Sequence, residues 1–142
     1  MTHVDPRAVW GAVAINQGIA HLLPGNGSQG LIEAAVHDFQ DGRVVEAITR
    51  APGIKRNDVV SGGYVLDTLN AAFWSLLTTD SAEDAIVHAV SLGSDADTTG
   101  AFTGALAGAL YGASTLPARW LDALHNAAEI RELEVRLVGW DT

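Results

Sequence analysis

The sequence predicts an all-α protein, a compact bundle of helices, and three observations support this prediction. Hydrophobic residues make up 48% of the 142-residue chain but aromatic residues only 6%, so alanine and aliphatic residues must fill the core. Such residues suit closely packed helices better than a β-sandwich. Apolar residues recur at helical spacing along most of the chain, and no segment alternates convincingly between apolar and polar residues. No linker, low-complexity tract or fixed-period repeat interrupts residues 1–142, so we expect a single domain.

Capping and turn residues predict where the individual helices begin and end. Asp5 before Pro6 marks a helix start, Asp41 has the position of an N-cap, and Ser81 with Asp84 forms a capping-box variant. Proline and glycine mark the ends of several apolar-periodic stretches. The predicted helices cover residues 5–23, 31–39, 44–50, 64–77, 82–93, 96–111 and, as one continuous helix with an apolar stripe, 117–137.

Charge and composition exclude several classes of function. The net charge is −9, from 8 basic and 17 acidic residues, which opposes bulk binding to a nucleic-acid backbone. The chain has no cysteine, so any metal must take oxygen or imidazole ligands. The most apolar segment, residues 100–113, falls short of the ~20 residues that cross a bilayer, so we expect no membrane partner. Residues 1–7 carry charge and a proline and show no basic region before an apolar stretch, so we expect no secretory signal and a cytoplasmic location.

The segment 91–99, SLGSDADTT, is the part of the sequence most indicative of chemistry. Asp95 and Asp97 lie two residues apart across a turn, so their carboxylates can point at one position, and Thr98 adds another oxygen. Oxygen ligands of this kind suit a hard cation such as Mg²⁺, Mn²⁺ or Ca²⁺. Gly93 permits backbone conformations that are barred to other residues and so helps to aim these ligands. We call residues 93–98 the acidic turn and interpret it as a candidate metal site.

A structural role for the same two aspartates is an equal alternative on spacing alone. Both could be acids at a helix start, where each stabilises the helix by about 0.3–1 kcal/mol. Downstream, glycine recurs at every fourth position, and we interpret this stripe as a packing surface that lets another backbone approach closely. The glycines of the stripe are Gly100, Gly104, Gly108 and Gly112.

Several elements of the sequence together resemble the ADP-ribosylglycohydrolase family, which includes the dinitrogenase-reductase-activating glycohydrolases. They stand in the family's order across nearly the whole chain, so their combination is more specific than any single motif. One departure is Ser94, where the family commonly has a second glycine. The matching elements are Thr2-His3 with residues 5–9, the loop 61–65 (SGGYV), the C-terminal signature 90–112 (VSLGSDADTTGAFTGALAGALYG), and Pro117 with Trp120-Leu121.

The resemblance implies an all-α enzyme, a compact orthogonal bundle, that holds two Mg²⁺ or occasionally Mn²⁺ ions. Such an enzyme hydrolyses the N- or O-glycosidic bond between ribose C1″ of ADP-ribose and an acceptor, and no catalytic residue is assigned within this chain. A surface position for the N-terminal histidine, and an ordinary turn leading into a helix for the two glycines, remain alternatives. The implied residues are Asp95, Asp97 and Thr98 for the metal, and His3, Gly62, Gly63 and Tyr64 for ADP-ribose.

The family's N-terminal half brings a Gly-Asp-rich opening and a Thr-Asp-Asp cluster that completes the metal site, and this sequence contains no such cluster. We therefore expect residues 1–142 to be the C-terminal part of the family's fold, either a fragment or a split subunit, with half a site that an N-terminal partner chain completes. The expected enzyme acts on an ADP-ribosylated protein or small molecule. An apolar patch left by the missing half would favour a homo-oligomer or poor solubility. The alternative function is a non-catalytic helical module that is structural or binds ADP-ribose. The sequence favours the enzyme over this alternative, because Asp95, Asp97 and Thr98 are all present and a purely structural protein has no need to keep them.

Overall fold

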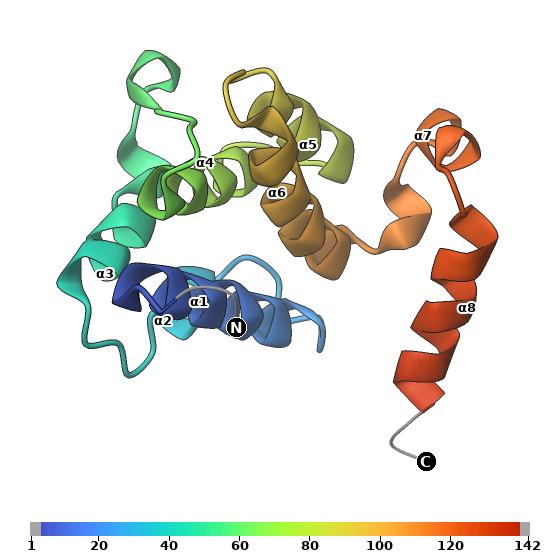
Figure 1. Ribbon diagram of the computed structural model, residues 1–142, viewed down its shortest axis with the longest axis horizontal. Helices are drawn as coiled ribbons and strands as arrows, with labels where there is room; N and C mark the ends of the chain where they lie inside the picture. The colour runs from blue at the N-terminus through green and yellow to red at the C-terminus, as the bar shows by residue number, and fades with distance from the viewer. Residues whose placement is uncertain (1–3, 140–142) are drawn as a thin grey trace.

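The computed structural model describes residues 4–139, and its fold in this range is entirely helical, as the sequence predicts (Figure 1). No strand occurs within these residues. None of the helices there is both long enough and apolar enough to cross a membrane. Three short 3-10 turns connect the α-helices, at Ala51–Gly53, Arg56–Asp58 and Ala113–Thr115. The α-helices are α1 (Pro6–Leu22), α2 (Leu31–Ala35), α3 (Gly42–Thr49), α4 (Val65–Leu77), α5 (Ala82–Val90), α6 (Ala96–Tyr111), α7 (Ala118–Ala123) and α8 (Ala127–Val138).

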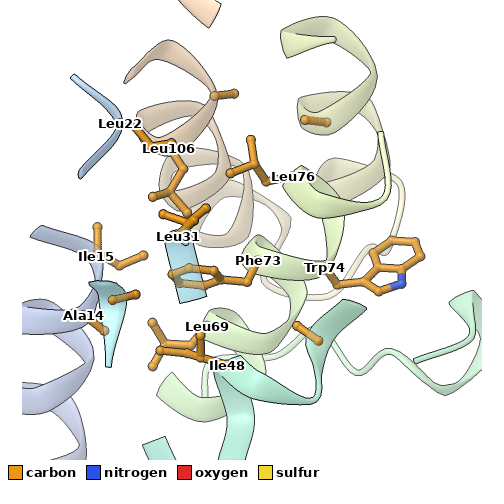
Figure 2. Close-up of a cluster of buried hydrophobic side chains, with 14 of the residues drawn as sticks. Ala14, Ile15, Leu22, Leu31, Ile48, Leu69, Phe73, Trp74, Leu76 and Leu106 are labelled. Atoms are coloured by element: carbon orange, nitrogen blue, oxygen red, sulfur yellow. The ribbon is translucent and has the colours of Figure 1, made fainter. Parts of the chain in front are cut away.

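Helix α4 is the central helix of the core. It packs against α1, α3, α5 and α6, and it is buried on nearly all sides over its last two turns. Phe73, which is fully buried, lies among aliphatic side chains from the surrounding helices (Figure 2). A helix that is apolar all round must be enclosed in this way to be stable. The neighbours of Phe73 in the core include Ile15, Leu22, Leu31, Ile48, Leu69, Leu76 and Leu106.

Helix α1 approaches α4 and α6 closely because glycine occurs at two of its buried positions. A Cβ atom at Gly11 would lie 2.9 Å from Cγ2 of Val65, and one at Gly18 would lie 3.2 Å from Cδ2 of Leu106. Contacts this short leave no room for a methyl group unless the neighbouring side chain moves. This packing brings the start of α1 beside the loop that precedes α4.

The predicted capping residues are confirmed by their hydrogen bonds. The Asp5 carboxylate accepts from the backbone N–H of Arg7 at 2.8 Å, and Asp41 accepts from Arg43 at 3.0 Å. The Ser81 hydroxyl oxygen accepts from the backbone N–H of residue 84 at 3.0 Å and opens α5. Each bond satisfies a helix N–H that has no partner within the helix.

The glycine stripe of α6 is a packing surface over only part of its length. A Cβ atom at Gly100 would lie 3.0 Å from Val90, and one at Gly104 would lie 3.9 Å from a methyl group of α5. Gly108, in contrast, would meet nothing within 4 Å, and Gly112 ends the helix at φ +85°. The prediction of a close backbone approach along the whole stripe is therefore wrong beyond Gly104, although α5 does pack on its first two glycines.

The prediction of one continuous helix over residues 117–137 is also wrong. The chain breaks between α7 and α8, where Leu124 is extended and Asn126 takes a left-handed conformation at φ 59°. Both helices stand apart from the rest of the molecule (Figure 1). Helix α7 is tied to α5 by the ion pair between Arg119 and Glu83. Helix α8 is exposed along almost its whole length, so its apolar residues do not join the core.

The helix predicted over residues 31–39 is shorter than expected. Helix α2 ends at Ala35, and the chain turns at Asp38, which has a left-handed φ of 59°. Aspartate is one of the few residue types that tolerate this conformation as a single residue.

Candidate metal and ADP-ribose site

The acidic turn joins α5 to α6 through two consecutive left-handed residues. Gly93 has φ +75° and Ser94 has φ 55°, and Asp95 then occupies the N-cap position of α6. The backbone N–H of Gly93 still bonds to the Val90 carbonyl at 3.1 Å, so the turn follows directly on the end of α5. Two left-handed residues reverse the chain within a short distance, which places the carboxylates at the start of α6.

The side chain of Asp95 does not cap α6. It accepts no hydrogen bond from the free N–H groups of the first turn, although its position is that of an N-cap. Its Oδ1 atom instead accepts from the Thr98 hydroxyl at 2.9 Å. The structural role that the sequence allows for both aspartates is therefore not filled by the Asp95 side chain, which does not cap the helix. Asp97 does lie in the first turn of α6, where an acidic residue stabilises a helix.

Both carboxyl groups of the acidic turn lie at the start of α6, at its N-cap position and in its first turn. The backbone N–H of Thr98, the neighbouring Asp95 carboxyl and the backbone N–H of Asp97 together lower the pKa of the Asp97 carboxyl. Neither aspartate forms an ion pair with a basic residue of the described chain. Their arrangement fits a hard cation by donor chemistry and by charge.

A cleft of about 350 Å³ adjoins the acidic turn. It brings together four residues that the sequence analysis assigned to the site from two separate segments, Gly63 and Tyr64 from the loop before α4 and Asp95 and Thr98 from the turn before α6. Gly62 and Asp97 do not line it, and His3 lies outside the described residues. The lining residues are Asp5, Arg7, Ala8, Gly63, Tyr64, Val65, Thr68, Asp95, Thr98 and Phe102.

Arg7 is a cleft residue that the sequence analysis missed. Its guanidinium forms two hydrogen bonds with the Asp5 carboxylate, at 2.9 and 2.5 Å, and donates to the Tyr64 hydroxyl at 3.0 Å. These contacts raise the pKa of Arg7 and lower that of Asp5, in both cases because the charged forms bond to each other. The cleft thus has a fixed cation on one wall and the Asp95 carboxylate on another. Nothing in the spacing of residues 5–7 indicates the contact with Tyr64.

Thr68 and Phe102 are further lining residues that the sequence analysis did not assign to the site, whereas Val65 is the last residue of the loop 61–65 that resembles the family. Thr68 is buried, and its hydroxyl donates to the Gly62 carbonyl at 3.0 Å, so it holds the loop before α4. Val65 and Phe102 pack partly against the core and supply the apolar part of the cleft. Thr68 and Phe102 lie inside predicted helices, and no local signal separates a core residue of a helix from one at the edge of a cleft.

The side chains of the acidic turn that could hold a cation are few. Within residues 4–139, no group of three or more histidine, aspartate or glutamate side chains is placed to hold a metal ion. Asp95, Asp97 and the Thr98 hydroxyl are the oxygen donors that the acidic turn offers.

The fold and the cleft define a helical protein with a paired-carboxylate, all-oxygen candidate cation site. Comparison with known proteins identifies the family. The model of the ADP-ribosylglycohydrolase family matches residues 1–141, and the chain belongs to this family.

Several curated proteins are similar in sequence to the chain. ADP-ribosylarginine hydrolase Tri1 of Serratia proteamaculans (strain 568) is 49% identical over 83 residues, which are 58% of this chain and 23% of that protein. ADP-ribosyl-dinitrogen reductase glycohydrolase of Rhodospirillum rubrum is 30% identical over 132 residues, which are 91% of this chain and 42% of that protein. The chain spans less than half the length of the curated relatives it matches.

Proposed function

We propose that the chain contributes the C-terminal part of the active site of a magnesium-dependent ADP-ribosyl hydrolase. The reaction is removal of ADP-ribose from an acceptor by hydrolysis of the bond at ribose C1″. An N-terminal partner, supplying the family's Thr-Asp-Asp cluster, completes the metal site. The substrate class is an ADP-ribosylated protein, because the relatives are named for ADP-ribosylarginine and for ADP-ribosylated dinitrogen reductase.

One observation carries the proposal. Asp95 and Thr98 line a cleft of about 350 Å³, Asp97 follows in the first turn of α6, and neither carboxylate has a basic partner among the described residues. An aspartate used only for helix stability would be expected to cap the helix or to form an ion pair, and the Asp95 side chain does neither. Divalent cations such as Mg²⁺ are bound by carboxylate and hydroxyl oxygens.

The chain's own residues have distinct roles in this proposal. Asp95 and Asp97 would hold the cation, and the Thr98 hydroxyl orients Asp95 through its 2.9 Å hydrogen bond. A bound divalent cation supplies Lewis-acid polarisation of the ribose hydroxyls and of a water molecule. Arg7, half-buried and held by Asp5, presents positive charge toward an anionic ligand in the cleft. Phe102 and Val65 exclude water from its inner wall.

Thermal unfolding of the purified chain tests the binding part of the proposal. Mg²⁺ and ADP-ribose added together should raise the unfolding midpoint, because a ligand at 100 times its Kd stabilises the native state by about 2.7 kcal/mol. Asp97→Asn should abolish the Mg²⁺-dependent part of the shift. Asp122→Asn removes the same charge from α7, away from the cleft, and should keep the shift. An equal response of both variants would contradict a cation site at the acidic turn.

Release of ADP-ribose from an ADP-ribosylarginine protein tests the reaction. We expect release when Mg²⁺ and a second polypeptide carrying the Thr-Asp-Asp cluster are both present, and none when either is omitted. The non-catalytic alternative predicts a different result: ADP-ribose binds without Mg²⁺, and no release occurs in any combination. Only this second outcome is compatible with a structural or binding module.

A further inference from the structure

The hydroxyl group of Ser61 connects the two segments that form the cleft. We call residues 61–64, which precede α4, the glycine loop. Ser61 Oγ donates to the Gly93 carbonyl at 3.1 Å and lies 3.1 Å from Oγ1 of Thr99. The two contacts reach across 32 and 38 residues of sequence, from the glycine loop to the acidic turn and to the first turn of α6.

Proton counting gives these hydrogen bonds a direction. A hydroxyl group has one proton, so Ser61, by donating to Gly93, can only accept from Thr99. The Thr99 hydroxyl also lies 3.0 Å from the Asp95 carbonyl oxygen, and its single proton is divided between that oxygen and Ser61. Thr99 is fully buried, so water cannot replace a lost partner at low cost. Ser61 and Thr99 therefore form one unit that contacts both ends of the Gly93–Asp95 segment.

The acidic turn needs support of this kind because its backbone is unfavourable. Ser94 occupies the left-handed region at φ 55°, which costs a residue with a Cβ atom free energy. Strained residues persist only where the surroundings hold them. Ser61 bonds to the carbonyl immediately before Ser94, and Thr99 bonds to the carbonyl immediately after it.

The glycine loop is held from its other side as well. Thr68 donates to the Gly62 carbonyl at 3.0 Å, and a Cβ atom at Gly63 would lie only 3.8 Å from Oδ2 of Asp95. The loop backbone thus lies against the carboxylate that faces the cleft. A shift of the loop away from Gly93 would move this wall of the cleft and release the turn at the same time.

We propose that Ser61 and Thr99 are positioning residues that fix the glycine loop and the acidic turn in one mutual arrangement. Their hydroxyl groups keep the Asp95 carboxylate at the cleft, although neither residue lines it. The effect of Ser61 and Thr99 on cation binding rests on the proposed function, whereas their effect on the backbone of the acidic turn does not.

Mn²⁺ titration of the full chain by calorimetry measures the consequence for cation binding. Ser61→Ala removes both contacts, and we expect roughly fivefold weaker Mn²⁺ binding, the factor that corresponds to loss of one ordinary hydrogen bond. Ser61→Thr keeps the hydroxyl and should restore the wild-type affinity. Thr99→Ser should likewise bind Mn²⁺ as the wild type does, and Thr99→Val should resemble Ser61→Ala.

Thr103→Val is the matched control. Thr103 is as fully buried as Thr99, lies one turn further along α6, and donates to the Thr99 carbonyl at 2.8 Å without reaching either loop. Its loss should lower the stability of the chain as much as the Thr99→Val change does, yet leave Mn²⁺ affinity unchanged. If Ser61→Ala weakens Mn²⁺ binding no more than Thr103→Val, the positioning role is overturned.

Amide hydrogen exchange separates this proposal from the proposed function. The N–H groups of Gly93 and Thr99 are hydrogen-bonded to the Val90 and Asp95 carbonyls and report on the turn without any metal. We expect both to exchange several-fold faster in Ser61→Ala and at the wild-type rate in Thr103→Val. If the wild-type chain binds no Mn²⁺, the proposed function fails, and exchange alone decides: faster exchange supports the positioning role and unchanged exchange overturns it.

Discussion

Replacement of Ser94 by glycine should stabilise the chain, because the side chain occupies a backbone conformation that suits glycine. Ser94 has φ 55°, and its hydroxyl makes no hydrogen bond within the described residues. The left-handed conformation costs a residue with a Cβ atom about 1–2 kcal/mol. Glycine avoids this cost but loses about 0.5–1 kcal/mol through its greater freedom in the unfolded chain. The expected net gain is about 0.5–1 kcal/mol.

Ser91→Gly provides a control with the opposite sign. Ser91 lies three residues earlier, has a right-handed φ of −70°, and its hydroxyl is also without a partner. Glycine relieves no strain there, so only the entropic loss remains, and stability should fall by about 0.5–1 kcal/mol. The same substitution is thus expected to raise stability at Ser94, within the acidic turn, and to lower it at Ser91, the C-cap of α5.

Urea unfolding followed by circular dichroism measures both variants against the wild type. A chain of this size shifts its thermal midpoint by roughly 3 °C per kcal/mol, so melting curves should separate the two variants by several degrees. The slope of the urea transition should stay constant, since neither change alters the surface exposed on unfolding. If the two variants shift in the same direction, the backbone strain assigned to Ser94 does not govern the stability of the turn.

Three further predictions concern the stability of variants in the core, at the N-cap of α1 and on α8. Phe73→Ala should lower stability by about 3–5 kcal/mol in urea unfolding, because the ring is fully buried at the centre of the core. Asp5→Asn keeps a capping side chain but removes the charge that bonds to Arg7. Since the pKa of Asp5 is lowered in the folded chain, the wild type should be more stable than the variant at pH 7, and this difference should shrink as the pH falls below about 4. Urea midpoints of both proteins at pH 7 and pH 3 measure the difference. Leu133→Ser on α8 should change the free energy of core unfolding by less than about 0.5 kcal/mol, because Leu133 is 47% exposed and is not part of the core cluster. A larger loss of stability would mean that α8 packs against the other helices.

Helix starts could be predicted from the sequence because each depends on residues within three positions of one another. Asp5, Asp41 and Ser81 bond to N–H groups two or three residues ahead, and the local spacing already contains that information. The bounds of α6 also match the prediction, since its first acids and the closing Gly112 both lie in the sequence at the helix ends.

The breaks at Asp38 and Asn126 could not be predicted in the same way. Aspartate and asparagine tolerate the left-handed conformation but do not require it, and both occur in helices. Whether such a residue turns the chain depends on what the following segment packs against. The helix that follows Asn126 contributes no side chain to the core cluster, whereas the sequence alone presents its apolar residues as a buried stripe.

The same distinction between local and long-range information applies to the candidate site. The acidic turn is contiguous, so the sequence could indicate Asp95, Asp97 and Thr98 together. The contacts that hold it, from Arg7 to Tyr64 across 57 residues and from Ser61 to Thr99 across 38, depend on how the helices pack. No local spacing encodes contacts between residues so far apart.

The separation of α8 from the core has a consequence for how the molecule melts. A peptide helix of 12 residues without neighbours is at the limit of stability in water, because the cost of nucleation is spread over few hydrogen bonds. The ellipticity contributed by α8 should decline gradually on heating, well below the temperature at which the packed helices lose their structure together. Only a surface that covers its leucine and valine side chains would merge the two transitions into one.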